Sequence, residues 1–413
     1  MPTRSPDPVS RRLFVRFLAG SPLLAAAGVN LRWLEQEPDL IKTANEALNV
    51  FDFEPVARKK LPPAHWGYLA TGTDDDATIR ANRDGYARFD LRPRRLIDVS
   101  HVDTSVTLLG TTWETPIILC PIGSQRAFHP EGELAVARAA KAKGHLQVLS
   151  TVATTSIEDV TAARGEPIWF QLYPRRDWNQ TKQRILRAER AGCPAIVLTV
   201  DLLGGSNRET LLREQQRDTR NCASCHPAGR PMPGISGSVD DRDNRRKPML
   251  AELAPGDPIP EVGTPTWDFV KRMKDTTKMK VFIKGIVTRE DAALAVKHGV
   301  DGLFVSNHGG RAENSTRATI LSLPEVVAGA AKRAVVEVDG GVRRGTDIFK
   351  ALAFGATVVG IGRPYIWGLA SFGQEGVETV LALLRRELEI VMRQAGTTSV
   401  NRITRDHLVA HGT

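Results

Sequence analysis

In the stretch VDGLFVSNHGGRAEN, residues 300–314, an apolar run ends abruptly in polar residues. Leu303, Phe304 and Val305 are typical of a strand that is buried on both faces, as in a parallel sheet. His308, two glycines and Arg311 follow at once. Such residues at the carboxyl end of a strand are typical of the face where α/β barrels build their active sites, and the glycines let a ligand approach the backbone closely.

Seven further apolar runs resemble this one in length and in their Val, Ile and Leu content. They are PIILCPIG (116–123), LQVLS (146–150), IWFQLY (168–173), AIVLTVD (195–201), KVFIKG (280–285), VVEVDGG (335–341) and TVVGIGR (357–363). Segments such as EGELAVARAAKAKG and REDAALAVKHG lie between them, with apolar residues at helical spacing and a Gly after the last turn. Eight such units predict an α/β protein with a (β/α)8 barrel over residues 45–413.

One connection breaks the regular alternation. Residues 202–266, after the fourth strand, are polar and rich in Pro, Gly and Arg, and they are far too many for an ordinary strand–helix connection. The sequence therefore predicts a long inserted loop on the active-site side of the barrel.

Composition excludes some classes of partner. The chain has 413 residues, a net charge of +9 and 41% hydrophobic residues, which suffices for one large core. The basic residues are dispersed and aromatic residues make up only 6%, so no basic stripe with stacking residues predicts nucleic-acid binding. Four cysteines are too few for a disulfide scaffold.

The first thirty residues have the pattern of a targeting segment. Arg11 and Arg12 precede a mild apolar stretch that ends in Ala25, Ala26 and Ala27. An arginine pair, an apolar run and a small-residue cleavage site in this order predict a twin-arginine export signal over residues 1–30, and hence a periplasmic enzyme. The alternative is an amphipathic surface helix on a cytoplasmic protein.

Polar residues at the predicted strand ends suggest a chemistry. His308 can accept a proton near neutral pH, and Asp201 can pair with its imidazolium. Arg208 and Arg311 suit a carboxylate, and Lys284 can stabilise a developing anion. The Gly-rich turns DGGVRRGTD (339–347) and GIGRP (360–364) suit a phosphate on the last two strands. Each residue alone has a structural explanation, but together they predict a phosphate-bearing cofactor beside a base and a carboxylate clamp.

Several motifs in this order resemble one known family. SNHGGR, FIKG, TVD, FQLY, DGGVRRGTDIFKALAFGA and IGRP are similar to those of the FMN-dependent α-hydroxy-acid oxidases and dehydrogenases, which include glycolate oxidase, lactate oxidase and dehydrogenase, and mandelate dehydrogenase. The resemblance runs from about Phe53 to the C-terminus, interrupted by the insertion. It implies an FMN enzyme that oxidises an L-2-hydroxy acid to the 2-oxo acid and passes the electrons to an acceptor.

The resemblance also implies a role for each matching residue. His308 would be the base and Asp201 its partner, while Tyr173 would contact the substrate hydroxyl. Arg208, Arg311 and Tyr68 would hold the substrate carboxylate. Lys284 would stabilise the reduced flavin. The remaining cofactor-binding residues would be Pro121, Ile122, Gly123, Ser150, Gln171, Thr199, Ser306, Asp339, Gly341, Arg343, Gly362 and Arg363.

Two departures from the family pattern bear on the substrate. Ala312, Glu313 and Asn314 stand where the family usually has Gln-Leu-Asp. Val152 stands where glycolate-type members carry a bulky aromatic residue. A smaller residue leaves room for a side chain, so we expect lactate or a larger 2-hydroxy acid in preference to glycolate.

Other readings stay open at this point. A different FMN barrel enzyme, of the isomerase or nucleotide-dehydrogenase type, and a non-catalytic flavin or haem electron-transfer protein are the alternatives. The acceptor can be oxygen, a quinone or a cytochrome. Relatives of this family often form tetramers, so the resemblance implies a homo-oligomer.

The insertion contains one unusual motif. Cys222, Cys225 and His226 fit the CxxCH pattern of covalent haem c attachment. A small disulfide in an oxidising compartment, or a pair of free thiols, explains the two cysteines as well, and we rank it above haem.

Overall fold

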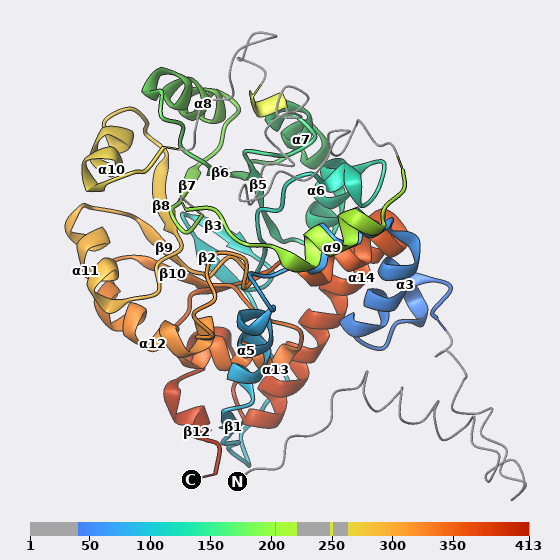
Figure 1. The fold of residues 1–413 in the computed structure, drawn as a ribbon. Helices are drawn as coiled ribbons and strands as arrows, with labels where there is room; N and C mark the ends of the chain where they lie inside the picture. Colours follow the sequence, from blue (N-terminus) through green and yellow to red (C-terminus); the bar gives the residue numbers. More distant parts are fainter. Residues whose placement is uncertain (1–39, 203, 221–247, 251–262, 413) are drawn as a thin grey trace, which may run out of the picture. The chain divides into compact units, whose positions relative to one another are not determined.

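The computed structural model of the chain describes residues 40–202, 204–220, 248–250 and 263–412 (Figure 1). The predicted export signal, residues 1–30, lies outside the described residues, as do Cys222, Cys225 and His226. From Lys42 onward the described residues belong to one compact unit.

Eight parallel strands close into a barrel, which confirms the predicted fold class. Its strands are β4 (Ile117–Leu119), β5 (Leu146–Ser150), β6 (Trp169–Leu172), β7 (Ala195–Thr199), β8 (Lys280–Lys284), β9 (Gly302–Val305), β10 (Val335–Val338) and β11 (Val358–Ile361). Each pairs with the next in the chain, and β11 pairs with β4 to close the circle. Nearly all of their residues are buried because the strands face the barrel interior on one side and helices on the other.

Helices follow the strands and surround the barrel (Figure 1). They are α6 (Gly132–Ala142), α7 (Ile157–Arg164), α8 (Trp178–Arg190), α10 (Trp267–Lys274), α11 (Arg289–Lys297), α12 (Thr319–Ala330), α13 (Gly345–Ala353) and α14 (Arg363–Ala395). Local sequence explains where some of them begin. The hydroxyl of Ser156 accepts the N–H of Asp159 at the start of α7, and Thr288 does the same for Asp291 in α11.

The insertion after β7 is not a loop throughout. Its described part contains helix α9 (Glu209–Arg217) and a short 3-10 helix, η6 (Pro248–Leu250). Helix α9 packs against α4 (Pro63–Ala70) so closely that a Cβ at Gly67 would lie 2.7 Å from Cβ of Glu214. This packing fixes the start of α9, where Arg208 stands.

The chain before the barrel forms short helices and strands. The helices are η2 (Ala44–Glu46), η3 (Val50–Asp52), α3 (Phe53–Lys60), α4 and α5 (Ala77–Tyr86), and η4 (Gln125–Ala127) follows β4. Strand β1 (Phe89–Leu91) pairs antiparallel with β12 (Leu408–Ala410), which follows η7 (Val400–Arg402) and η8 (Arg405–His407). The C-terminal end of the described chain therefore pairs with the segment that precedes the barrel.

A hairpin closes the barrel at the end opposite the polar rim. Strands β2 (Val106–Leu108) and β3 (Thr111–Trp113) pair antiparallel. Val106 and Leu108 belong to one buried cluster with the residues that begin the barrel strands, such as Leu146, Ala195 and Val358. The hairpin therefore covers the amino-terminal mouth, and only the carboxyl-terminal mouth is available for a ligand.

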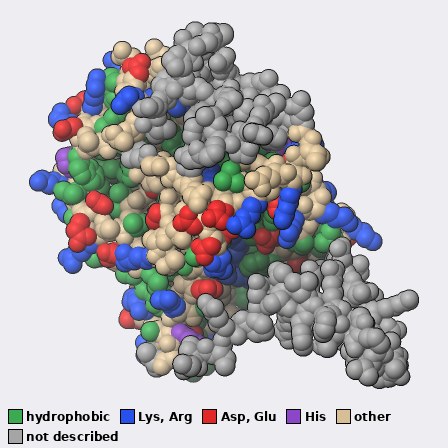
Figure 2. All heavy atoms as spheres, in the orientation of Figure 1, with side chains coloured by type: hydrophobic (Ala, Val, Ile, Leu, Met, Phe, Trp, Pro, Cys, Tyr) green, Lys and Arg blue, Asp and Glu red, His purple; other side chains and the backbone are tan. Residues whose placement is uncertain are grey.

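The surface shows no large area of one charge on the face in view. Basic and acidic side chains are interspersed there (Figure 2), in agreement with the dispersed basic residues of the sequence. Among the described helices, none combines the length and the apolar character that a bilayer crossing needs.

Candidate active site

A cavity of about 260 Å³ lies at the carboxyl ends of the barrel strands. Most of the predicted site residues line it: Tyr68, Pro121, Ile122, Gly123, Ser150, Tyr173, Arg208, Lys284, His308, Arg311, Asp339, Gly341, Arg343, Gly362 and Arg363. Four others do not line it. Asp201, Gln171 and Ser306 lie behind this wall and hydrogen-bond to residues that line it, and Thr199 pairs with Lys284 in the neighbouring strand.

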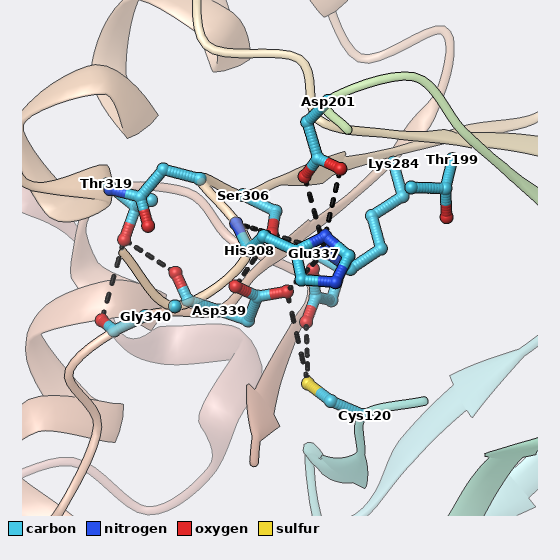
Figure 3. A network of polar contacts seen from close by, with 12 residues as sticks. Cys120, Thr199, Asp201, Lys284, Ser306, His308, Thr319, Glu337, Asp339 and Gly340 are labelled. Carbon is cyan, nitrogen blue, oxygen red and sulfur yellow. Dashed lines mark hydrogen bonds and ion pairs between the residues drawn. The ribbon is translucent and has the colours of Figure 1, made fainter. Parts of the chain in front are cut away.

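His308 is held between two polar side chains. Its Nδ1 lies 2.9 Å from Oδ1 of Asp201, and its Nε2 lies 3.3 Å from the hydroxyl of Tyr173 (Figure 3 shows the aspartate contact). Because the carboxylate is an acceptor only, Nδ1 carries the proton and Nε2 presents its lone pair. The backbone of His308 has a φ of 58°, a left-handed conformation rare for a residue with a Cβ, and its N–H donates to Oγ of Ser306 at 3.0 Å.

The environment keeps this imidazole neutral. Burial lowers the pKa of His308 below its usual value; Asp201 opposes the shift, and the positive charge of Lys284 adds to it. Burial disfavours the charged carboxylate of Asp201, but Lys284 and His308 outweigh that effect and lower its pKa. A neutral base beside an ionised carboxylate is therefore the resting arrangement.

Lys284 is the positive centre of a buried network under this base (Figure 3). Its Nζ lies 2.5 Å from Oγ of Ser306, 3.5 Å from Oδ2 of Asp339 and 3.6 Å from Oδ2 of Asp201. Burial acts against the charged amine, yet the two carboxylates raise its pKa. Gly285 permits the contact, because a Cβ there would lie 2.6 Å from Cβ of Asp201.

Five guanidinium groups line the same cavity, and four of them, those of Arg208, Arg311, Arg343 and Arg363, are considered together because they influence one another. Burial and the neighbouring Arg208 lower the pKa of Arg311 to about 9. Burial and Arg343 lower the pKa of Arg363 to about 10, and Arg343 itself is lowered to about 10 by burial and Arg83. Within the described residues, the hydrogen bonds of these four side chains go to backbone carbonyls and to Ser206, not to carboxylates. They are positive charges that an anion would stabilise.

Two amide networks that hold the rim in place depend on residues from distant elements. Gln171 accepts from the hydroxyl of Ser150 at 3.2 Å and donates to Oγ1 of Thr199 at 2.8 Å, so it links three neighbouring strands. Asn82 of α5 and Asn307 exchange amide hydrogen bonds of 2.9 and 3.0 Å and fix the turn that carries His308. Asn307 could be identified from the sequence because it stands in the SNHGGR motif, but no pattern in the sequence indicated Asn82.

A second polar cluster, of Cys120, Glu337 and Asp339, extends from the wall of the cavity into the barrel and was not predicted as a cluster. Sγ of Cys120 is 3.9 Å from Oε1 of Glu337 and 4.0 Å from Oδ2 of Asp339. Glu337 is fully buried in β10, and burial, with the charge of Asp339, raises its pKa well above the usual value and so favours the neutral carboxyl. Although these three residues could offer ligand atoms, the amine of Lys284 already supplies the cation beside Asp339. The only indication of this cluster in the sequence was Glu337, an acidic residue inside the apolar run VVEVDGG.

The donors around the cavity fit FMN. Arg343 and Arg363 offer two guanidinium groups without carboxylate partners among the described residues, as a phosphate requires. The backbone at Gly340 and Gly341 lines the cavity with φ values of 101° and 84°, and it packs so closely on α5 that a Cβ on Gly341 would lie 2.2 Å from the carbonyl oxygen of Asn82. Lys284 and Ser150 supply further polar groups among the lining residues.

Comparisons with known proteins agree with this geometry. Residues 57–410 match the family described as FMN-dependent dehydrogenase. The chain is 41% identical over 367 residues to glycolate oxidase of Spinacia oleracea, with 88% of this chain and 96% of that protein covered. It is 40% identical over 368 residues to a peroxisomal (S)-2-hydroxy-acid oxidase of Oryza sativa subsp. japonica, which covers 89% and 97%.

A solved structure of mandelate oxidase superimposes with a TM-score of 0.75 at 36% identity, over 88% of this chain and 98% of that one. Both the sequence match and the structural match span the barrel and its rim, where the base, the lysine and the arginines lie. The chain therefore belongs to the FMN-dependent dehydrogenase family and is an FMN-dependent oxidoreductase of the 2-hydroxy-acid type.

Proposed function

We propose that this enzyme oxidises (S)-2-hydroxy acids of the size of lactate or larger, with His308 as the base. The observation that carries the proposal is the position of Nε2 of His308. Its proton-free face lies in the same cavity as Arg208 and Arg311, while Nδ1 is held by Asp201. Around this space the base can act on the substrate's hydroxyl-bearing carbon, while the two guanidinium groups bind the adjacent carboxylate.

FMN supplies the acceptor for the two electrons that leave the substrate carbon. Arg343 and Arg363 would hold its phosphate, and Lys284 would face the ring through the network with Ser306 and Asp339. The protein itself binds and orients the substrate and moves one proton. His308 takes that proton at Nε2, and the carboxylate of Asp201 stabilises the imidazolium that forms.

The substrate preference rests on Val152. This residue lines the cavity, and its Cγ2 already lies 2.4 Å from the position that a Cβ on Gly123 would take. A larger residue in this place would fill space that a substrate side chain can occupy. Val152 thus favours lactate, longer or aromatic 2-hydroxy acids over glycolate.

The test is anaerobic flavin reduction by glycolate, (S)-lactate and (S)-mandelate, followed by stopped-flow absorbance. We expect lactate or mandelate to have the higher rate constant, and His308→Ala to retain FMN but lose about 10²–10⁴-fold in rate. His101→Ala, which changes an exposed histidine, is the control. Wild-type flavin reduction by His308→Ala would contradict the assignment of the base.

Val152→Phe tests the preference separately. The aromatic ring should fill the space that the phenyl group of mandelate needs. It should therefore raise the ratio of specificity constants for glycolate over mandelate by about tenfold or more, the range typical of small changes in an apolar pocket. Steady-state kinetics with an artificial electron acceptor measure the ratio. A wild-type enzyme that already prefers glycolate, or a variant with an unchanged ratio, would contradict this part of the proposal.

We further propose that the enzyme is exported by the twin-arginine route, passes its electrons to a respiratory carrier rather than to oxygen, and assembles as a homo-oligomer. The pattern of residues 1–30 supports export, that location alone supports a respiratory carrier, and the family resemblance supports a homo-oligomer. Replacing Arg11 and Arg12 by Lys should leave the protein in the cytoplasmic fraction of an expressing cell. Equal periplasmic amounts of the variant and the wild type would contradict export by this route.

A further inference from the structure

The two arginines that suit the substrate carboxylate come from different parts of the chain. Arg208 stands at the start of α9 in the insertion, and Arg311 stands in the turn after β9. Strand β8 lies between the two barrel strands that precede them. Guanidinium hydrogen bonds are directional, so the pair fits a carboxylate only at a suitable separation. Contacts outside the sheet must hold that separation.

One short loop, residues 71–76 between α4 and α5, contacts both segments. The N–H of Thr73 donates to the carbonyl oxygen of Gly310 at 2.9 Å, and the N–H of Asp74 donates to the carbonyl oxygen of Asn207 at 2.7 Å. Gly310 and Asn207 are the residues directly before the two arginines. Two consecutive residues of the loop therefore each hold the backbone beside one arginine.

Asp76 fixes the shape of this loop. It has a φ of 62°, a left-handed conformation that Asp and Asn adopt more readily than most residues with a Cβ. Although it precedes α5, which the structure describes in full, its side chain does not cap that helix. Its Oδ1 accepts the N–H of Gly72 at 2.5 Å, and its Oδ2 accepts the hydroxyl of Thr210 at 2.6 Å. One carboxylate thus closes the loop and ties it to the first turn of α9, beside Arg208.

The charge of Asp76 has a second effect, on the proposed phosphate site. Burial and Arg343 lower the pKa of Arg363, and the carboxylate of Asp76 opposes that shift. A variant that only removes the charge therefore differs from one that also breaks the bridge to Thr210. This difference allows the two effects to be measured separately.

We propose that Asp76 is a positioning residue for substrate binding. Its bridge between Gly72 and Thr210 sets the separation of Arg208 and Arg311, and through it the affinity for the substrate carboxylate. Asp76 is not among the described residues that line the cavity, so its effect passes through the two guanidinium groups. This inference rests on the proposed function, because it takes the ligand of the two arginines to be the carboxylate of a 2-hydroxy acid.

The experiment separates the bridge from the charge with four variants. Asp76→Gly removes the side chain and accepts the left-handed backbone without strain. Asp76→Asn removes only the charge, because an amide can still accept the N–H of Gly72 and donate to the hydroxyl of Thr210. Thr210→Val removes the hydroxyl and keeps Asp76. Asp75→Asn is the matched control, since Asp75 is an exposed acid of the same loop that pairs with the exposed Arg80.

The measurements use the FMN-loaded enzyme and the better substrate of two pairs, (S)-lactate with pyruvate or (S)-mandelate with benzoylformate. Steady-state kinetics give kcat and KM separately. The Kd of the 2-oxo acid comes from the change it causes in the flavin absorbance. FMN content and melting temperature show that each variant is folded.

We expect Asp76→Gly to raise KM and Kd by about tenfold or more, since a small displacement of a clamp weakens hydrogen bonds of fixed geometry. The kcat should stay within about threefold, as for a loss of binding that ground state and transition state share. Asp76→Asn and Asp75→Asn should keep wild-type KM and Kd. Thr210→Val should act like Asp76→Gly, and the double variant should add less than about twofold, because both changes break the same bridge.

Three outcomes overturn the inference while the 2-hydroxy-acid activity stands. They are wild-type KM and Kd in folded Asp76→Gly, equal losses in Asp76→Gly and Asp76→Asn, and losses that multiply when Asp76→Gly and Thr210→Val are combined. If Asp76→Gly does not bind FMN, wild-type KM and Kd in Thr210→Val overturn it equally. If neither acid reduces the flavin of the wild type, the proposed function itself fails.

Discussion

At the scale of single residues, the chemistry of this site depends on how each charge is surrounded. His308 is an ordinary histidine in the sequence, but burial, Lys284 and Asp201 together decide which protonation state it holds. Glu337 shows the opposite case, because a carboxyl without a hydrogen-bond partner for its buried Oε2 becomes neutral. Burial disfavours the charged form of both residues. It therefore favours the neutral imidazole of His308, which can accept a proton, and the neutral carboxyl of Glu337, which can donate one.

The lowered pKa of His308 determines the pH dependence of the reaction. The base works only when neutral, so kcat/KM should be constant above this pKa and fall as the pH drops through it, below about 6.5. Asp201 raises this pKa, so Asp201→Asn should move the acid limb to lower pH. The plateau should also fall, by about 10²-fold or more, because the imidazolium loses its counter-charge.

A pH series of kcat/KM for both proteins measures the two effects. Asp301→Asn is the control, because Asp301 pairs with Lys280 at the amino end of the barrel. An acid limb that moves to higher pH in Asp201→Asn would show that Asp201 does not act on His308 as described.

At the scale of the elements, the interior of the barrel depends on close contact between neighbouring strands. Phe282 of β8 packs against Trp169 and Phe304, with ring centroids 4.5 and 6.1 Å apart. Gly302 of β9 faces the same interior, and a Cβ there would lie 2.0 Å from Cε1 of Phe282. This glycine is therefore required by packing, not by a turn.

Gly302→Ala should lower the free energy of unfolding by about 1–3 kcal/mol, as overpacking of a dense core does. Urea unfolding of the FMN-loaded protein measures the change. Gly110→Ala in the turn between β2 and β3 is the control. A Cβ on Gly110 would meet no atom within 4 Å and would carry only the strain of a φ of 81°, for which we expect about 1 kcal/mol. An equal or smaller effect at Gly302 would contradict the packing explanation.

At the scale of the whole molecule, the two mouths of the barrel serve different purposes. The hairpin of β2 and β3 closes one mouth with apolar side chains, while the other carries the charged cavity. The residues that stabilise the barrel at one mouth therefore lie one strand length away from the residues that carry out the chemistry at the other, as in other barrels of this kind.

Leu108→Ala in the hairpin should test this separation. The side chain is 2% exposed, so its truncation should lower the free energy of unfolding by about 2–5 kcal/mol. The rate of flavin reduction at saturating substrate should stay within about twofold, because the site lies at the other mouth. Leu96→Ala, at a fully exposed leucine, should change stability by less than about 0.5 kcal/mol. A loss of activity without a loss of stability in Leu108→Ala would contradict the separation.

The sequence by itself determined the barrel, the rim and most of the residues that line the cavity. Strands buried on both faces leave long apolar runs, and the polar residues that end them stand next to those runs in the chain, so both signals are local. His308, Lys284 and the Gly-rich turns were visible for that reason.

Only the tertiary structure decided which residues meet across the barrel. Asn82 reaches Asn307 from a helix more than two hundred residues away, and Cys120 meets Glu337 beside Gly360 of the strand between them. Arg175 stood in the sequence beside Arg176 as one of two equal charges, until the packing of β6 and its loop buried one and exposed the other. Burial depends on all the elements around a residue, so the shifted pKa values could not be derived from the chain alone.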